Sequence, residues 1–390
     1  MPPAEPENLD NAGYIGVSPT PGQLPQRGER QWIDRPEQLL RAVNVLQQSN
    51  VVAIDAEFAQ VRSRAQGDAL TFSHRLALLQ LAIDGHCFVV DALRLGDLSP
   101  LATVVENPDV IILLHGAGAD LRVMAERGLN VAHYYDLEAT SRAIFGQHES
   151  SLAAMLQRAF NVRLDKSLQR TDWSRRPLPT AMIAYAARDA EMTLALYYWL
   201  NQHYSWALKL YESTRQQEPV ALWIEPFLRG SSAVPPEVAL ADAIKQGIIL
   251  DEEQVYADCR AALASLTNPA RRSRLLRLIA DLSLVQLAPD IEPLLQAPTA
   301  DERASAVRAL GRLKVEQSKE LIRPLLRDPV QDVRKAAQLA LRDPNTKEPR
   351  GPTVSPTRLA DGARSWTVGE TSSSDDDSDW KARLRSIMGE

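Results

Sequence analysis

Two acidic residues, Asp55 and Glu57, stand two positions apart directly after the apolar run Val51–Ile54. Side chains alternate between the two faces of a β-strand, so both carboxylates are expected to project from one face. Neighbouring anions repel each other, and a hard divalent cation bound through oxygen relieves that repulsion. The pair therefore predicts a metal site; the alternative is a strand end that exposes two solvated acids.

Three further side chains could complete such a site. Asp120 follows the turn His115–Ala119 at the beginning of a predicted helix, where the helix N-terminus favours a carboxylate. Tyr185 and Asp189 are four residues apart in a helical pattern, so they share one face of that helix. Each has an ordinary alternative: Asp120 as a common first-turn acid, and Tyr185 and Asp189 as a core phenol beside a surface acid.

The elements expected around these residues are mostly strands first and helices later. Strands are predicted at 51–54, 76–83, 86–91 and 110–114, and helices at 35–48, 119–127, 137–145, 151–160 and 180–204. This order indicates an α/β layer architecture, in which helices pack on a sheet.

The order of the acidic residues resembles the DEDD superfamily of 3′→5′ exonucleases, which has a ribonuclease H-like fold. Asp-x-Glu ends an early strand, an Asp follows a later strand, and Tyr-x-x-x-Asp lies in a late helix. Tyr185 marks the tyrosine subclass, because position 184, where the other subclass has histidine, is alanine. The stretches Leu164–Leu178, Leu79–Gln80 and Asp136–Ala139 look like ribonuclease D and its close relatives. The resemblance covers roughly residues 31–204.

This resemblance implies a mixed sheet flanked by helices and a phosphodiester hydrolysis that uses two divalent cations, Mg²⁺ or Mn²⁺. It implies that Asp55, Glu57 and Asp189 hold one ion and that Asp55 and Asp120 hold the other. Tyr185 would orient the attacking water. The family usually has threonine where Ala56 stands, a difference that removes a hydroxyl but no ligand.

Basic and aromatic residues near these acids are expected to bind the nucleic acid. The segment 161–176 has a local excess of positive charge. Four of its residues are candidates for contacts to the phosphate backbone: Lys166, Arg170, Arg175 and Arg176. Phe58 and Trp173 could stack on terminal bases, and burial in the core is the alternative for each.

An internal repeat follows the part that resembles the exonucleases. Ile291–Leu295 recurs as Ile322–Leu326, thirty-one positions later. The pattern resembles HEAT-like repeats and predicts an all-α solenoid, which either presents a surface to a protein partner or only caps the first domain.

The chain of 390 residues is therefore expected to contain two domains and two tails. The predicted organisation is a disordered tail at 1–31, the exonuclease domain at 32–217, the HEAT-like domain at 218–343 and a disordered acidic tail at 344–390.

The cysteine count, the length of the apolar runs and the net charge limit the classes of protein that fit this sequence. The two cysteines, Cys87 and Cys259, cannot form a disulfide framework and predict a reducing compartment, the cytoplasm. No apolar run reaches the ~18 residues of a membrane span, so no membrane partner is expected. The net charge of −6 disfavours a non-specific nucleic-acid coat protein but not a nuclease.

The predicted function is a 3′→5′ exoribonuclease that matures tRNA or another structured RNA with a single-stranded 3′ overhang. A DNA 3′→5′ exonuclease is one alternative, because no residue is identified that would read the 2′-hydroxyl. A non-catalytic RNA-binding scaffold is the other. Loss of any of the four acids would favour the scaffold, and all four are present.

Overall fold

The computed structural model describes most of the chain. Its ranges are 21–25, 28–64, 70–164, 168, 171–211, 218–229, 234–342, 353–358 and 364–369. For 61–64, 70–74 and the last two ranges, only the backbone is described.

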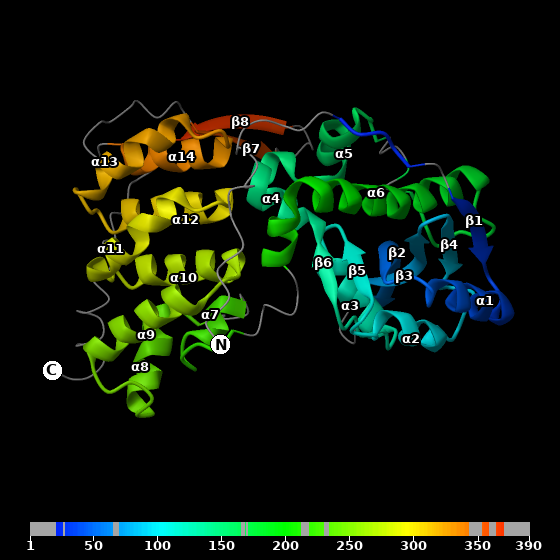
Figure 1. Cartoon of the computed structure of the whole chain (residues 1–390), viewed down its shortest axis with the longest axis horizontal. Coiled ribbons are helices and arrows are strands. Elements are labelled where there is room, and N and C mark those ends of the chain that lie inside the picture. Colours follow the sequence, from blue (N-terminus) through cyan, green and yellow to red (C-terminus); the bar gives the residue numbers. More distant parts are fainter. Residues whose placement is uncertain are drawn as a thin grey trace, which may run out of the picture.

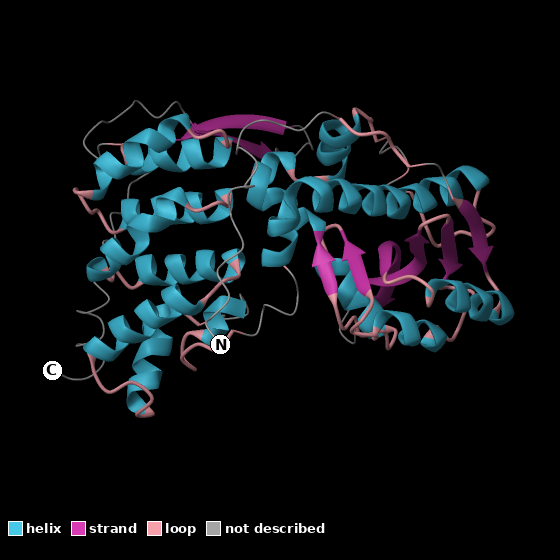
Figure 2. Ribbon diagram, in the orientation of Figure 1, coloured by secondary structure: helices cyan, strands magenta, loops and turns pink. Residues whose placement is uncertain are grey.

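A mixed sheet forms the centre of the N-terminal part (Figures 1 and 2). Its strands are β1 (Glu29–Ile33), β2 (Val51–Arg64), β3 (Leu70–Ile83), β4 (His86–Asp91), β5 (Ile111–Leu114) and β6 (Tyr134–Asp136). Across the described residues they lie in the order β1-β4-β3-β2-β5-β6. The central β2, β3 and β4 are antiparallel, whereas β1, β5 and β6 add to them in parallel.

Helices cover both faces of this sheet (Figure 1). One face buries apolar side chains of α1 (Pro36–Leu46), α2 (Ala102–Val105) and α3 (Gly118–Glu126). The other face buries those of α4 (Leu137–Phe145), α5 (Leu152–Phe160) and the long α6 (Thr180–Leu210). The fold is therefore the expected α/β arrangement, and β2 lies between two hydrophobic cores.

The structure differs from the sequence predictions in three local details. The acids Asp55 and Glu57 lie within β2 rather than at its end, because the strand continues to Arg64 in a long hairpin with β3. The predicted tail at 1–31 overlaps β1, which pairs in parallel with the distant β4. The predicted tail at 344–390 contains a described hairpin of β7 (Thr353–Arg358) and β8 (Arg364–Gly369). The other residues of both predicted tails, except 21–25 and 28, lie outside the described ranges.

The C-terminal part is a stack of helices with its own hydrophobic core (Figure 1). These helices are α7 (Glu225–Arg229), α8 (Pro236–Lys245), α9 (Glu252–Ser265), α10 (Pro269–Asp281), α11 (Ala288–Ile291), α12 (Ala300–Arg312), α13 (Ser318–Ile322) and α14 (Gln331–Ala340). None of the described helices of the chain is long and apolar enough to cross a membrane.

The thirty-one-residue repeat of the sequence is visible in side-chain contacts of this stack. Arg303 donates hydrogen bonds to the carbonyl oxygens of Ala297 and Pro298. Arg334 does the same for Asp328 and Pro329, each thirty-one positions further along the chain. The assignment of these units as HEAT repeats remains a prediction.

The stack contacts the first part of the chain through α4, which packs on α12. The backbone N–H of Gln147 donates to Asp332 at 2.6 Å, and Arg142 lies 3.6 Å from the carboxylate of Asp301. The hydroxyl of Tyr211 donates to the same Asp301 at 3.5 Å. The junction is thus polar, and it involves residues that follow or belong to α4 and α6.

Candidate active site

The alternation of β2 places Asp55 and Glu57 on the face of the sheet covered by α6. Ile54 and Ala56 point into the core shared with α1 and α3. Ala53, which has the same parity as the two acids, packs in the core shared with α6. The two carboxylates therefore lie beneath α6, as the period of two predicts.

A β-bulge lies beside Glu57. The partner of β2 jumps from Leu78, opposite Glu57, to Leu76, opposite Phe58, so the pairing skips Ala77. Bulges bend a strand and redirect its side chains, and they recur next to active sites. The carbonyl of Ala77 accepts hydrogen bonds from the Ala92 N–H and from the guanidinium of Arg176.

Small residues on α6 bring this helix close to the sheet. Ala186, Ala187 and Ala190 are fully buried on the side that faces the strands. The Cys87 thiol of β4 lies 3.5 Å from the carbonyl oxygen of Ala187. This close approach places Asp189 and Tyr185, one helical turn apart, over the acids of β2.

Three acids converge in the described part of the chain. Carboxylate oxygens of Asp55, Glu57 and Asp189 all lie within 4.8 Å of one another. Asp120 is outside this group, yet it is near enough for its charge to raise the pKa of Asp55. Tyr185 makes a hydrogen bond with Asp189. The structure thus brings together three of the four predicted acids and the tyrosine, with the fourth acid beside them.

Asp120 is positioned by an acid that the sequence analysis did not select. It lies in the first turn of α3, after a turn in which Gly116 has φ = 82°. Asp136, at the end of β6, accepts hydrogen bonds from the N–H groups of Gly116 and Ala117. Asp136 also caps α4 through the N–H groups of Glu138 and Ala139. In the sequence, the position of Asp136 between a short strand and a helix could have indicated this capping role.

Burial and mutual repulsion raise the pKa of every one of these acids for which a shift is resolved. Burial, followed by the charge of Asp55, raises the pKa of Glu57 to about 9. Burial, with the charge of Asp136, raises the pKa of Asp120 to about 7. The pKa of Asp55 lies well above its usual range, from burial and then from the charges of Asp189 and Asp120. Such clustering of perturbed carboxyls is typical of functional sites.

The donor set fits a divalent cation. The convergent groups are carboxylate oxygens, the hard ligands that Mg²⁺, Mn²⁺ and Ca²⁺ prefer over the nitrogen and sulfur ligands favoured by zinc. A cation among them would offset the repulsion that raises their pKa values. Asp55, Glu57 and Asp189 are therefore able to hold such an ion.

The residues predicted to contact the nucleic acid differ in how deeply they are buried. Trp173 is 2% exposed and packs at a ring-centroid distance of 6.3 Å from Tyr185, which favours burial in the core over base stacking. Phe58 is partly buried against the core of α1 and α3. Arg175 is exposed and pairs with Asp172 three residues earlier. Lys166 and Arg170 lie outside the described residues.

The phosphate contact predicted for Arg176 does not fit the structure. Its guanidinium makes a two-pronged ion pair with the fully buried Asp91, at 2.6 and 2.7 Å. Its remaining N–H groups donate to the carbonyl oxygens of Trp173, Arg175 and Ala77. All five donors of an arginine are thereby used within the protein. Arg176 ties its loop to the bulge beside Glu57.

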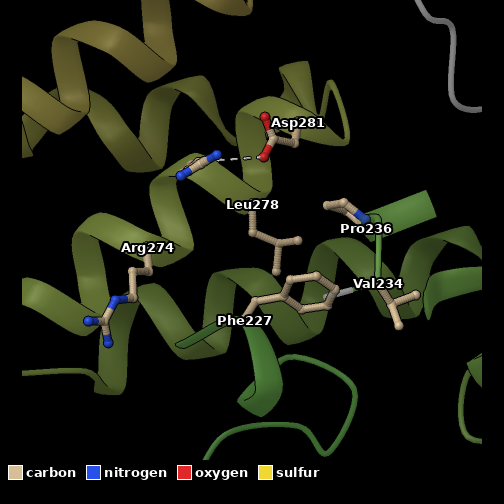
Figure 3. Close-up of a pocket in the computed structure, with 7 residues that line it drawn as sticks. Phe227, Val234, Pro236, Arg274, Leu278 and Asp281 are labelled. Atoms are coloured by element: carbon tan, nitrogen blue, oxygen red, sulfur yellow. Dashed lines mark ion pairs between the residues drawn. The ribbon is translucent and has the colours of Figure 1, made fainter. Parts of the chain in front are cut away.

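A cavity of about 260 Å³ lies elsewhere, in the helical stack between α7, α8 and α10 (Figure 3). Phe227, Val234 and Leu278 form its apolar wall, and Arg274 and Asp281 lie at its ends. Arg274 donates to the carbonyl of Leu228, and Asp281 pairs with Arg312 and with Arg277, the third charged residue of the lining. The cavity has no part in the acidic site.

The part of the chain that contains these acids matches a known protein family. Residues 30–204 match a family model described as a 3′-5′ exonuclease. The match contains the sheet except Glu29, α6 as far as residue 204, and every acid of the site.

Curated relatives match the same part of the chain. It is 32% identical to ribonuclease D of Haemophilus influenzae over 165 residues, which is 42% of this chain and 39% of that protein. It is 33% identical to ribonuclease D of Escherichia coli over 143 residues, 35% of each chain. An exosome complex component 10 homolog of Drosophila melanogaster is 29% identical over 42% of this chain and 18% of its own length. The chain thus spans less than half the length of these relatives.

One solved structure similar to this chain is that of a bacterial protein. The crystal structure of Escherichia coli RNase D, described as an exoribonuclease involved in structured RNA processing, covers 79% of this chain and 75% of its own. Its TM-score is 0.41 and its sequence identity 22%.

Proposed function

We propose that this chain, whose residues 30–204 match the 3′-5′ exonuclease family and are similar to ribonuclease D, is a metal-dependent exoribonuclease acting from the RNA 3′ end. The observation that carries the proposal is the convergence of Asp55, Glu57 and Asp189, from β2 and α6, within 4.8 Å. Hydrolysis of a phosphodiester produces negative charge at the attacking and leaving oxygens, where cations held by such a cluster would stabilise it.

Each acid has a role in this proposal. Asp55, Glu57 and Asp189 hold one Mg²⁺ or Mn²⁺, and Asp55 with Asp120 holds the second. The separate position of Asp120, outside the group of three, supports this division. Asp55 contributes to both sites. The charges of Asp189 and Asp120 both raise its pKa, which supports a position of Asp55 between these two acids.

Tyr185 orients the attacking water by hydrogen bonding. Burial and the nearby charges of Asp189 and Glu57 raise the pKa of its phenol above the usual 10. The hydroxyl therefore stays protonated at neutral pH and positions the water by hydrogen bonding rather than by accepting a proton from it.

The substrate is proposed to be the 3′ end of tRNA or another structured RNA, with a single-stranded overhang entering the site. The relatives named ribonuclease D support RNA over DNA. Arg175, exposed on the loop next to α6, is the described candidate for a phosphate contact. The helical stack is proposed to bind a protein partner, and the cytoplasm is the expected location.

Two controls separate the alternatives. A DNA 3′→5′ exonuclease would degrade single-stranded DNA at least as fast as RNA of the same sequence. A non-catalytic scaffold would bind RNA without shortening it in the presence of Mg²⁺.

The test is cleavage of RNA and DNA labelled at the 5′ or 3′ end, with Mg²⁺, Mn²⁺ or EDTA. We expect stepwise shortening from the 3′ end of RNA, which EDTA abolishes. Asp55→Asn and Asp189→Asn should each slow it by about 10³-fold or more, equivalent to about 4 kcal/mol of activation barrier. Asp109→Asn changes an exposed acid away from the cluster and should leave the rate unchanged. Full activity of both Asp55→Asn and Asp189→Asn would contradict the proposal.

A further inference from the structure

A buried amide in β3 has no hydrogen-bond partner. Gln80 is 0% exposed, and neither its Oε1 nor its Nε2 is hydrogen-bonded in the described structure. Leaving a buried polar group unsatisfied costs free energy, so most such groups in folded proteins have hydrogen-bond partners. An apolar side chain of the same size would avoid this cost, which makes the amide the feature that requires an explanation.

The strand register places Gln80 directly opposite Asp55. The two residues are Cα partners in the antiparallel pair of β2 and β3, so their side chains project from the same face. Directly opposed residues have Cβ atoms about 4.5–5.5 Å apart. A glutamine amide two carbons beyond its Cβ therefore reaches the carboxylate of the residue opposite by rotation of its side chain.

The residues next to Gln80 on its own strand and directly opposite it on β4 are apolar. Leu78 and Ala82, two residues before and after Gln80, belong to the apolar core beneath α6. Val89, its register partner on β4, belongs to the same core. Ala187, from the part of α6 that covers these strands, is also part of it. The diagonal neighbours Glu57 and Asp91 are acidic, but both carboxylate oxygens of Asp91 already accept from Arg176. Asp55 is the acceptor that lies directly opposite the amide.

We propose that Gln80 is a positioning residue for Asp55, and this inference rests on the proposed ion site. Its Nε2 donates a hydrogen bond to one carboxylate oxygen of Asp55 when the acids hold their cations. This hydrogen bond would fix the orientation of Asp55 and leave its other lone pairs available to the cations that the acids would hold. Groups that orient metal ligands in this way commonly contribute 10–100-fold to metal affinity.

The test is titration of the metal-free protein with Mn²⁺ by calorimetry, together with thermal unfolding without metal. Gln80→Met keeps an unbranched side chain of similar size but removes the amide. We expect Mn²⁺ to bind it 10–100-fold more weakly than the wild type. Its unfolding temperature without metal should be equal or higher, because an unsatisfied buried group has been removed. Gln80→Leu repeats both measurements in case the first variant does not fold.

Ser141→Ala is the matched control. Ser141 is another fully buried residue whose hydroxyl has no described partner, and it lies on α4 rather than beneath the acids. Its removal should leave Mn²⁺ affinity unchanged. Asp55→Asn, which removes a proposed ligand, shows how the Mn²⁺ titration looks when the site is damaged.

Two failures can be told apart. If wild-type protein binds Mn²⁺ and the folded Gln80 variants bind it equally well, Gln80 only fills the core and the inference is overturned. If the wild type itself takes up no Mn²⁺, the proposed function fails, and the role of Gln80 fails with it.

Discussion

The carboxyl groups of the site hold protons that a cation must displace. Glu57, with its pKa near 9, and Asp120, with its pKa near 7, are wholly or partly protonated at neutral pH in the metal-free protein. A protonated carboxyl is a poor ligand, so cation binding releases protons from the site.

Cation affinity should therefore depend on pH. Both pKa values are raised, so deprotonation, and with it ligand quality, increases as the pH rises from about 6 to about 9. We expect the Kd for Mn²⁺ to fall across this range, with fewer protons released per ion at its upper end than at neutral pH. Calorimetry in buffers with different ionisation enthalpies measures both quantities. An affinity that is constant with pH would mean that the acids are ionised before the ion binds.

Adjacent arginines on one loop are expected to behave differently. Arg176→Ala leaves the buried Asp91 without its cation, and we expect a loss of about 3–5 kcal/mol in the free energy of unfolding. Arg175→Ala removes an exposed charge and should change this free energy by less than about 0.5 kcal/mol. It should instead weaken RNA binding and lower the slope of log affinity against log salt concentration by about 1.

Denaturant unfolding and RNA binding at several salt concentrations distinguish these outcomes. If Arg176→Ala unfolds like the wild type and binds RNA more weakly, then Arg176 contacts phosphate after all and its ion pair with Asp91 is dispensable for the fold.

At the scale of elements, the site depends on how closely α6 lies on the sheet. The buried Ala186, Ala187 and Ala190 permit this approach. A larger side chain among them would push the helix outward and separate Asp189 from the acids of β2.

Ala187→Leu is expected to reduce cleavage by about 10²-fold, the effect of a displacement of about 1 Å in an active site. The overpacked core should also cost about 1–3 kcal/mol of stability. Ala181→Leu makes the same change at an exposed position of α6 and should alter neither quantity. Rates measured well below the unfolding temperature separate loss of geometry from loss of folded protein, and a normal rate for folded Ala187→Leu would contradict this account of α6.

On the scale of the whole molecule, the helical stack contacts the N-terminal α/β part through α4 and α12, away from the acids on β2 and α6. The contacts are polar: Asp332 accepts from the backbone of Gln147, and Asp301 lies beside Arg142 and Tyr211. None of the site acids takes part in these contacts. The stack is therefore expected to affect stability and partner choice more than the chemical step.

A fragment ending at residue 217 should retain cleavage of short single-stranded RNA. We expect its unfolding temperature to be lower than that of the full chain, because α4 loses its packing against α12. The comparison uses initial rates and thermal unfolding of both proteins. If the fragment is soluble and folded but inactive, the proposed domain division is wrong.

Local patterns in the sequence predicted much of this molecule. The period of two placed Asp55 and Glu57 on one face, and the spacing of four placed Tyr185 and Asp189 on one side of a helix. Strands β3 to β5 and helices α1 and α3 to α6 were also recognisable, although several end points differ. These features follow from the geometry of the local backbone, which is the same in every protein.

Tertiary structure alone decided which side chains become partners. Arg176 pairs with Asp91, eighty-five residues earlier. Trp173 enters the core, and Gln80 faces Asp55 because of the register between two strands. Burial and pairing between distant segments depend on how whole elements pack, and no short stretch of sequence contains that information.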